Sequence, residues 1–346
     1  MVSTSVSVRP GMSDRSNLAP IALFVYNRPG HTQRTVNSIR ENESASHSDL
    51  FVFSDGAKNE AGSDAVQQVR RYIRTIRGFR SVTIIERERN WGLADSVISG
   101  ITDLCNQFGR VIVMEDDLLT TPDFLTFINQ ALKRYESEPK IFSVSGFNFG
   151  FQGPEDYPYD AFSFYRSSSL GWGTWLDRWR LADWTMSDYH RFCADREQQR
   201  RFNRGGDDLS GMLAMQMHGK SNSWAVRWAY THFKHDALAL LSFQPRVFHI
   251  GSDRSATHSR WSFFKQLPLT GEHKSEFHFP DNVGLEKSFV LELQKSFRPS
   301  LARKLVRYLL HGRLSLTTNH LDSARFLPAK TEPYVAPNAG GRSFND

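Results

Sequence analysis

The feature that most constrains this chain is a regular alternation, over its first third, of short apolar runs with longer segments of helical spacing. The runs are Ile21–Tyr26, Leu50–Ser54, Ser81–Ile85 and Arg110–Met114. The first and last are apolar at nearly every position, which is typical of strands buried on both faces. Strands that alternate with helices pair in parallel, with helices on both faces of the sheet. The sequence therefore predicts an α/β fold with a mostly parallel sheet.

The pattern changes beyond residue 140. A strand-like run at Ile141–Ser145 is followed by aromatic sequence rich in glycine and proline, and then by helical stretches at Asp188–Asn203 and Asp208–Gly219. We predict a disordered leader at 1–19, one domain at 20–260 with halves 20–118 and 119–260, and a C-terminal helical extension at 261–346.

Composition excludes several classes of protein. No apolar run approaches the roughly 18–20 residues that cross a bilayer, and Met1–Pro20 lacks the apolar stretch of a secretory signal. The two cysteines, Cys105 and Cys193, cannot build a disulfide framework or a zinc cluster. We therefore expect a cytoplasmic protein. Its net charge of +6 suits an anionic membrane, a nucleic acid or a phosphorylated small substrate.

Polar residues follow each of the early strands, at the edge where ligands bind in open parallel sheets. They are Asn27 and Arg28 after the first run, Asp55 after the second, Asn90 after the third, and Glu115, Asp116 and Asp117 after the fourth. We expect these residues to converge on one crevice. The glycine-rich dinucleotide fingerprint and the P-loop are both absent from the sequence, so a nucleotide would be held without a glycine cradle.

The three adjacent acids 115–117 are the most informative cluster. Carboxylates that leave a buried strand side by side repel one another strongly. A divalent cation relieves this repulsion, and Mg²⁺ or Mn²⁺ prefers one or two carboxylates together with phosphate oxygens. The cluster therefore predicts a metal-bridged diphosphate, the alternative being a solvated acidic turn.

At this point the chain resembles a family. Val111–Phe127, with the pattern E-D-D-L followed by P-D-F, resembles the N-acetylglucosaminyltransferase I class of nucleotide-sugar-dependent glycosyltransferases, which have the GT-A fold. Further similar segments occur in the same order, including Val25–Arg28, Phe53–Asp55, Arg89–Leu93, Val144–Asn148, Leu170–Trp175 and Arg204–Trp228, the last two being similar to related bacterial sugar transferases. The resemblance covers about residues 20–260.

The resemblance implies a role for each polar strand end. Asp117 would be the direct metal ligand, and Glu115 and Asp116 would face the ribose and the sugar. Asp55 would bind a uracil edge, with Arg28 and Asn90 also at the nucleotide sugar. The alternatives from the residues alone are a strand-end cap for Asp55 and a surface turn for Arg28.

Glycosyl transfer also needs a base that takes a proton from the acceptor hydroxyl. In the eukaryotic relatives this is an aspartate in a W-D-D-W stretch, but Trp224–Trp228 carries no carboxylate. We predict Asp208 as the base, with Asp207 as the next choice, although this position also suits a helix N-cap.

Three further residues are candidates for binding. His258 is a candidate metal ligand or diphosphate contact, and Arg254 a candidate phosphate contact, against structural roles for both. Trp172 lies between two glycines and is the candidate for stacking on the acceptor sugar. The spacing of Trp172, Trp175 and Trp179 fits one helical face, which favours the core for the latter two.

The segment Arg298–Arg313 contains five basic residues and no acid, and its spacing predicts a basic amphipathic helix. Such a helix can lie peripherally on the anionic inner face of a membrane, or pack on the catalytic domain with a solvated basic face. A nucleic-acid partner is not favoured, because no binding motif accompanies the charge.

The sequence as a whole predicts a glycosyltransferase that moves a sugar from a UDP-sugar to a glycan or lipid-linked acceptor with Mn²⁺ or Mg²⁺. The resemblance implies inversion by a single displacement. The alternatives are a sugar-phosphate nucleotidyltransferase and a non-catalytic membrane-surface protein with a degenerate transferase domain.

Overall fold

The computed structural model describes residues 18–251, 266–270 and 273–297. Nearly all of the predicted leader and the whole of the predicted basic helix 298–313 therefore lie outside the described residues. Among the helices that are described, none has the length and apolar character needed to span a membrane.

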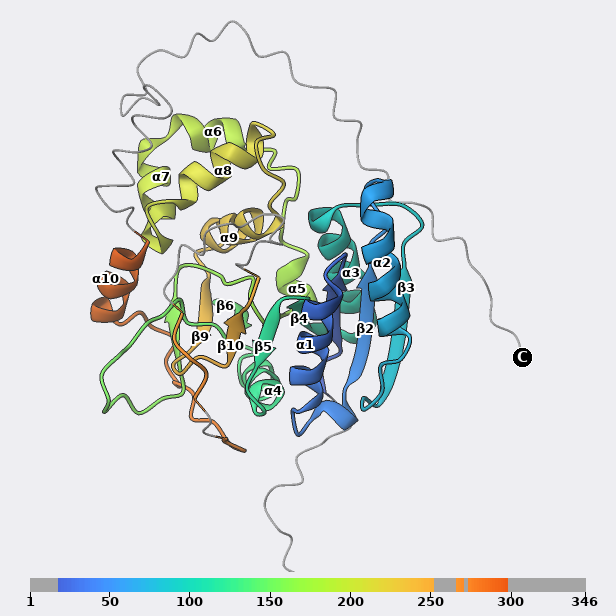
Figure 1. Ribbon diagram of the computed structural model, residues 1–346. Helices are drawn as coiled ribbons and strands as arrows, with labels where there is room; N and C mark the ends of the chain where they lie inside the picture. Colours follow the sequence, from blue (N-terminus) through green and yellow to red (C-terminus); the bar gives the residue numbers. More distant parts are fainter. Residues whose placement is uncertain (1–17, 252–265, 271–272, 298–346) are drawn as a thin grey trace, which may run out of the picture. The chain divides into compact units, whose positions relative to one another are not determined.

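An eight-stranded mixed sheet forms the centre of the fold (Figure 1). In spatial order its strands are β3 (Ser81–Glu86), β2 (Asp49–Ser54), β1 (Ile21–Val25), β4 (Arg110–Glu115), β8 (Trp172–Trp175), β6 (Ile141–Ser145), β9 (Leu238–Ser242) and β7 (Ala161–Phe164). The strands β3, β2, β1 and β4 are all parallel, as are β6 and β9. β8 and β7 run antiparallel to their neighbours. The predicted α/β class with a mostly parallel sheet is confirmed.

Helices cover both faces of this sheet, as the two-sided apolar strands predict. In β1, Leu23 packs in a core with α1 (Pro29–Arg40), α2 (Glu60–Ile73) and α4 (Phe124–Arg134), whereas Phe24 points to the other core. That second core is shared with α3 (Leu93–Phe108), α5 (Leu176–Trp179) and α9 (Trp224–Lys234). Burial of apolar side chains on both faces is what fixes the layered arrangement.

A smaller helical layer packs against α9 through a third apolar cluster. It contains α6 (Tyr189–Ala194), α7 (Arg196–Phe202), the 3₁₀ turn η3 (Asn203–Gly205) and α8 (Leu209–Met217). The single helix predicted over Asp188–Asn203 is wrong, because the chain breaks at Asp195. The carboxylate of Asp195 accepts hydrogen bonds from the N–H groups of Glu197 and Gln198 and so starts α7 anew.

Two other short helices complete the described chain. The 3₁₀ turn η2 (Ala45–His47) follows α1, and α10 (Lys287–Ser296) packs through Phe289 and Leu293 onto the larger core. The helix α10 is the described part of the predicted C-terminal helical extension.

The strand order reverses between β1 and β4, and the carboxyl ends of strands at such a reversal are where open parallel sheets bind ligands. After β1 the chain turns into α1, whose first residue is Pro29, a residue suited to the start of a helix. After β4 it passes through Asp116 and Asp117 into β5 (Leu118–Thr120), which pairs antiparallel with β10 (Val247–His249). The candidate site is assembled where these segments meet.

Candidate metal and nucleotide-sugar site

The three acids at the end of β4 share a partly buried position. Burial and, after it, the negative charges of Asp117 and Asp116 together raise the pKa of Glu115 to about 8. Burial, followed by the charge of Asp117, likewise raises the pKa of Asp116 to about 7. The mutual repulsion expected from the sequence is therefore present, and it favours a cation at this position.

Asp117 is the member of this cluster that meets positively charged partners. Its Oδ2 lies 2.9 Å from Nη1 of Arg28 and 3.3 Å from Nε2 of His249. Burial alone would raise the pKa of Asp117, but the hydrogen bonds and charges of His249 and Arg28 lower it overall. Arg28 also contacts His31, with Nη2 and Nε2 2.7 Å apart. The alternative of a surface turn for Arg28 is wrong, because its side chain is only 9% exposed.

Asp116 turns toward the end of β1. Its Oδ2 accepts hydrogen bonds from the N–H of Tyr26 at 3.3 Å and the hydroxyl of Thr32 at 3.5 Å. These contacts join the end of β4 to the β1–α1 turn across the point where the strand order reverses.

Asp117 and His249 fit a divalent cation. A carboxylate oxygen and an imidazole nitrogen suit Mn²⁺, and such ions complete their coordination with phosphate oxygens and water. Gly251 is what permits the approach of these two side chains: a Cβ at this position would lie 2.0 Å from Oδ2 of Asp117 and 2.6 Å from Nε2 of His249. Within the described ranges no group of three or more His, Cys, Asp or Glu side chains gathers to hold a metal. A metal ion held by this pair would take its remaining ligands from water or phosphate oxygens.

His249 is a residue that the sequence reasoning missed. It lies on the strand-like run Arg246–Ile250, whereas the histidine predicted as a metal ligand is His258, further along the sequence. Only the long-range pairing of β10 with β5 reveals that His249 reaches Asp117. His258 and Arg254 both fall in 252–265, outside the described residues.

Asp55 and Asn90 form a second cluster, separate in its contacts from the acids. The carboxylate of Asp55 accepts hydrogen bonds from the N–H groups of Gly56, Trp91 and Gly92 and from Nδ2 of Asn90, at 2.8–3.1 Å. Both oxygens are thus engaged in holding the turn that follows β3. This geometry supports the strand-end alternative for Asp55, and its uracil contact stays a prediction.

Asp208 is held by an arginine. Its two carboxylate oxygens lie 2.7 Å and 3.1 Å from Nη1 and Nη2 of Arg166, whose side chain is 7% exposed. Asp208 occupies the N-cap position of α8, but its side chain makes no capping hydrogen bond. Asp207, beside it, is exposed. Asp208 thus stands at the N-cap position, as the alternative expected, but it does not cap the helix through its side chain, and the arginine fixes the direction of its carboxylate.

The acceptor role predicted for Trp172 is wrong. Trp172 is 0% exposed, in the centre of the sheet on β8, and its ring stacks on Trp224 with centroids 5.4 Å apart. It also packs on Trp179 and Trp228. Trp172 and Trp175 are the two ends of β8 and Trp179 is the last residue of α5, so the three do not lie on one helix. The predicted core positions of Trp175 and Trp179 are confirmed.

The GNT-I family model matches residues 2–205 of the 346 in the chain, more than half of it. The chain belongs to the GNT-I family. This confirms the resemblance seen in the sequence and places the chain in a glycosyltransferase family. The match includes the acid cluster and most of the sheet, and it ends just before Asp207 and Asp208.

Individual relatives are distant. The chain is 24% identical over 190 residues to an alpha-1,3-mannosyl-glycoprotein 2-beta-N-acetylglucosaminyltransferase of Arabidopsis thaliana. That alignment covers 48% of this chain and 41% of the plant protein, so the chain spans less than half the length of this relative.

Similar solved structures include two transferases. One is a mannosyltransferase from Pyrobaculum calidifontis in complex with GDP-Man and Mn²⁺, with 13% identity, a TM-score of 0.33 and coverage of 50% of this chain and 49% of the other. The second is S. aureus TarS, with 12% identity, a TM-score of 0.31 and coverage of 47% and 30%. The family assignment rests on the family model rather than on these weak similarities.

Proposed function

We propose that this GNT-I family member transfers a sugar from a UDP-sugar to a glycan or lipid-linked acceptor, using Mn²⁺ or Mg²⁺ and inverting the anomeric carbon. The observation that carries the proposal is the position of Asp117 at the reversal of the strand order, 3.3 Å from His249. A carboxylate and an imidazole meeting at this edge of the sheet are suited to a cation that binds a diphosphate.

Asp117 and His249 would hold the metal. When bound, the ion would stabilise the negative charge that develops on the leaving diphosphate. Arg28, beside Asp117, adds a positive charge on the same edge. Glu115 and Asp116 would face the donor's ribose and sugar, in agreement with the resemblance.

Asp208 would be the base. As the acceptor hydroxyl oxygen forms its bond to the anomeric carbon, its proton passes to the Asp208 carboxylate, and the bond to the diphosphate oxygen breaks with its electron pair. One such displacement inverts the anomeric centre. Arg166 would hold the carboxylate in its orientation through the two hydrogen bonds described above.

We also propose a cytoplasmic location and a peripheral membrane contact through 298–313, and we expect no nucleic-acid partner. These three proposals rest on the sequence alone. They agree with a lipid-linked acceptor, and vesicle co-sedimentation of the full chain with and without anionic lipid measures the membrane contact.

The decisive test is calorimetric titration of UDP with and without Mn²⁺, combined with a turnover assay on a panel of UDP-sugars. We expect UDP to bind only with the metal, and Asp117→Asn to lose both metal-dependent binding and turnover. The matched control is Asp64→Asn, which removes an exposed carboxylate on α2 and should behave as wild type. Equal turnover by Asp117→Asn would refute the proposal.

The two alternatives give different results in the same experiments. A nucleotidyltransferase would release pyrophosphate from a nucleoside triphosphate in the presence of a sugar phosphate. A non-catalytic binding protein would turn over no UDP-sugar and would bind UDP equally with and without the metal.

A further inference from the structure

The two-stranded ribbon of β5 and β10 carries both proposed metal ligands at one end. Its register pairs Leu118 with His249 and Thr120 with Val247. One step beyond, the N–H of Ile250 donates to the carbonyl of Asp117 at 2.8 Å. The distance between the side chains of Asp117 and His249 therefore depends directly on this register.

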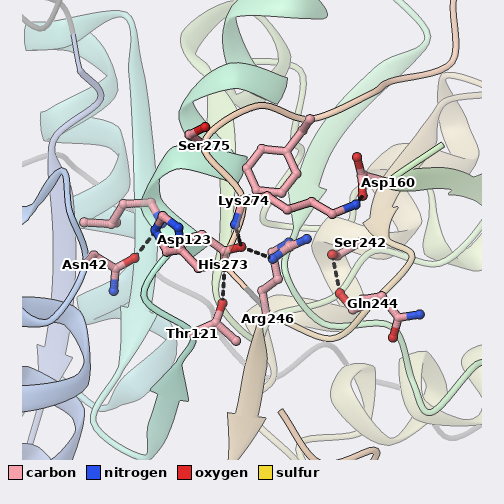
Figure 2. Close-up of polar contacts among 12 residues, drawn as sticks. Asn42, Thr121, Asp123, Asp160, Ser242, Gln244, Arg246, His273, Lys274 and Ser275 are labelled. Carbon is pink, nitrogen blue, oxygen red and sulfur yellow. Dashed lines mark hydrogen bonds and ion pairs between the residues drawn. The ribbon is translucent and has the colours of Figure 1, made fainter. Parts of the chain in front are cut away.

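The opposite end of the ribbon holds a buried ion pair. The N–H of Thr121 donates to the carbonyl of Arg246 at 3.0 Å, which continues the ladder by one pair. The Arg246 side chain then reaches the carboxylate of Asp123, and the two side chains are 5% and 0% exposed (Figure 2). The pair is thus fully withdrawn from water.

The surroundings of the ion pair hold it in one geometry. Oδ1 of Asp123 accepts a hydrogen bond from the hydroxyl of Thr121 at 2.6 Å, and Oδ2 accepts one from the N–H of Lys274 at 3.0 Å. The guanidinium of Arg246 lies over the rings of Phe277, at 4.4 Å, and Phe127, at 5.4 Å. A slide of one strand along the other would break these contacts together.

We propose that Asp123 and Arg246 are positioning residues that fix the register of β5 on β10, and thereby place His249 beside Asp117. The part of its test that measures Mn²⁺ binding rests on the proposed function. A slip by one residue would turn His249 to the opposite face of the ribbon. It would also separate Asp123 from Arg246 and leave two buried charges without partners, which is costly.

An ion pair suits this task better than apolar contacts would. The ribbon is short, with three paired positions and one further backbone hydrogen bond at each end, so the backbone alone specifies its register weakly. Apolar side chains can pack against one another in several arrangements, whereas a buried charged side chain is stable only beside its oppositely charged partner. Buried pairs often add little net stability, and their best documented use is to specify register.

The main test replaces both charges by apolar residues in the double variant Asp123→Leu with Arg246→Met. Because neither ion is left alone, we expect the protein to fold, with a Tm somewhat below that of wild type because the N–H of Lys274 loses its acceptor. We expect its affinity for Mn²⁺, measured by titration of the full chain, to fall roughly 10–100-fold, as for loss of other outer-sphere partners. Hydrogen exchange of the metal-free chain should be faster in 117–121 and 247–250.

The control is Arg178→Met. Arg178 is also a buried arginine, 5% exposed, and it donates hydrogen bonds to backbone carbonyls that are distant from it in the sequence. The substitution should lower Tm and leave Mn²⁺ affinity unchanged. If the double variant does not fold, Arg246→Lys takes its place, since it keeps the charge and loses the second hydrogen-bonding arm.

The two readouts separate the inference from the proposed function. Unchanged exchange in both ribbon strands of the folded variant overturns the inference, whatever the metal does. If wild type binds no Mn²⁺, the proposed metal site fails, and faster exchange confined to the ribbon would still support the positioning role. Faster exchange throughout the protein would contradict it, because that result indicates general destabilisation.

Discussion

His249 Nε2 lies 3.3 Å from Oδ2 of Asp117, although the two residues are 132 positions apart in the sequence. Asp117 reaches this position because β4 ends at the reversal of the strand order, and His249 because β10 pairs with β5. The candidate site therefore depends on a long-range strand pairing rather than on a local motif. A substitution beside this pair that replaces neither residue gives the first prediction.

Gly251→Ala should weaken metal binding. The new Cβ would lie 2.0 Å from Oδ2 of Asp117, so the carboxylate or the β10 strand must move. We expect roughly a tenfold or larger loss of Mn²⁺ affinity, measured by titration of the full chain. The control is Gly211→Ala in α8, where nothing lies within 4 Å of an added Cβ. Equal affinities for the two variants would contradict the proposed ligand pair.

Trp172→Ala should act on stability. Its ring is fully buried among three other tryptophans, and loss of such a side chain typically costs about 3–5 kcal/mol of unfolding free energy. Urea denaturation measures this cost, and Trp172→Phe should restore part of it. If the urea midpoint is unchanged and the KM for the acceptor rises, Trp172 would instead belong to the acceptor site.

The sequence was sufficient for the first half of the fold, because buried strands such as β1 and β4 are apolar on both faces and end in turn residues. It was insufficient for the second half. The spacing of the tryptophans around Trp172 fits one face of a helix, but it fits equally well a strand followed by a short helix. Propensity does not decide between them, and the pairing of β8 with β4 and β6 does.

The site shows the same division. The acid cluster at 115–117 and its neighbour Arg28 could be placed at one edge by the rule for parallel sheets alone. His249 and Arg166 could not, because each reaches its aspartate through contacts between distant segments. Asp55 illustrates a further limit: its position at a strand end is as predicted, but its hydrogen bonds hold the neighbouring turn.

Asp208→Asn should lower kcat by about 10²–10⁴-fold, the usual effect of losing a general base. The KM for the donor should change little, because the substitution keeps the size of the side chain and leaves the acid cluster intact. Asp207→Asn is the matched control and should stay within a few-fold of wild type. A larger loss of kcat in Asp207→Asn would transfer the role to that residue.

His232 should make the protein less stable in acid. Its ring is 0% exposed, with Nδ1 2.9 Å from the carbonyl of Trp228 and Nε2 2.9 Å from the hydroxyl of Ser143. Burial, opposed by the hydrogen bond to the Trp228 carbonyl and assisted by the nearby His235, lowers its pKa to about 4. The neutral ring satisfies both contacts, because one nitrogen donates and the other accepts.

The sign of the effect follows from the two protonation states. The unfolded chain binds a proton at His232 near pH 6.5, whereas the folded chain resists it down to about pH 4. Stability contributed by the neutral ring is thus fully present above pH 6.5 and is lost as the pH falls toward 4, by roughly 3 kcal/mol. His232→Gln should be less stable at pH 7 but should lose less between pH 6.5 and 4 in urea denaturation. Carboxylates titrate in both proteins and cancel in the difference, so parallel pH profiles would contradict the assignment.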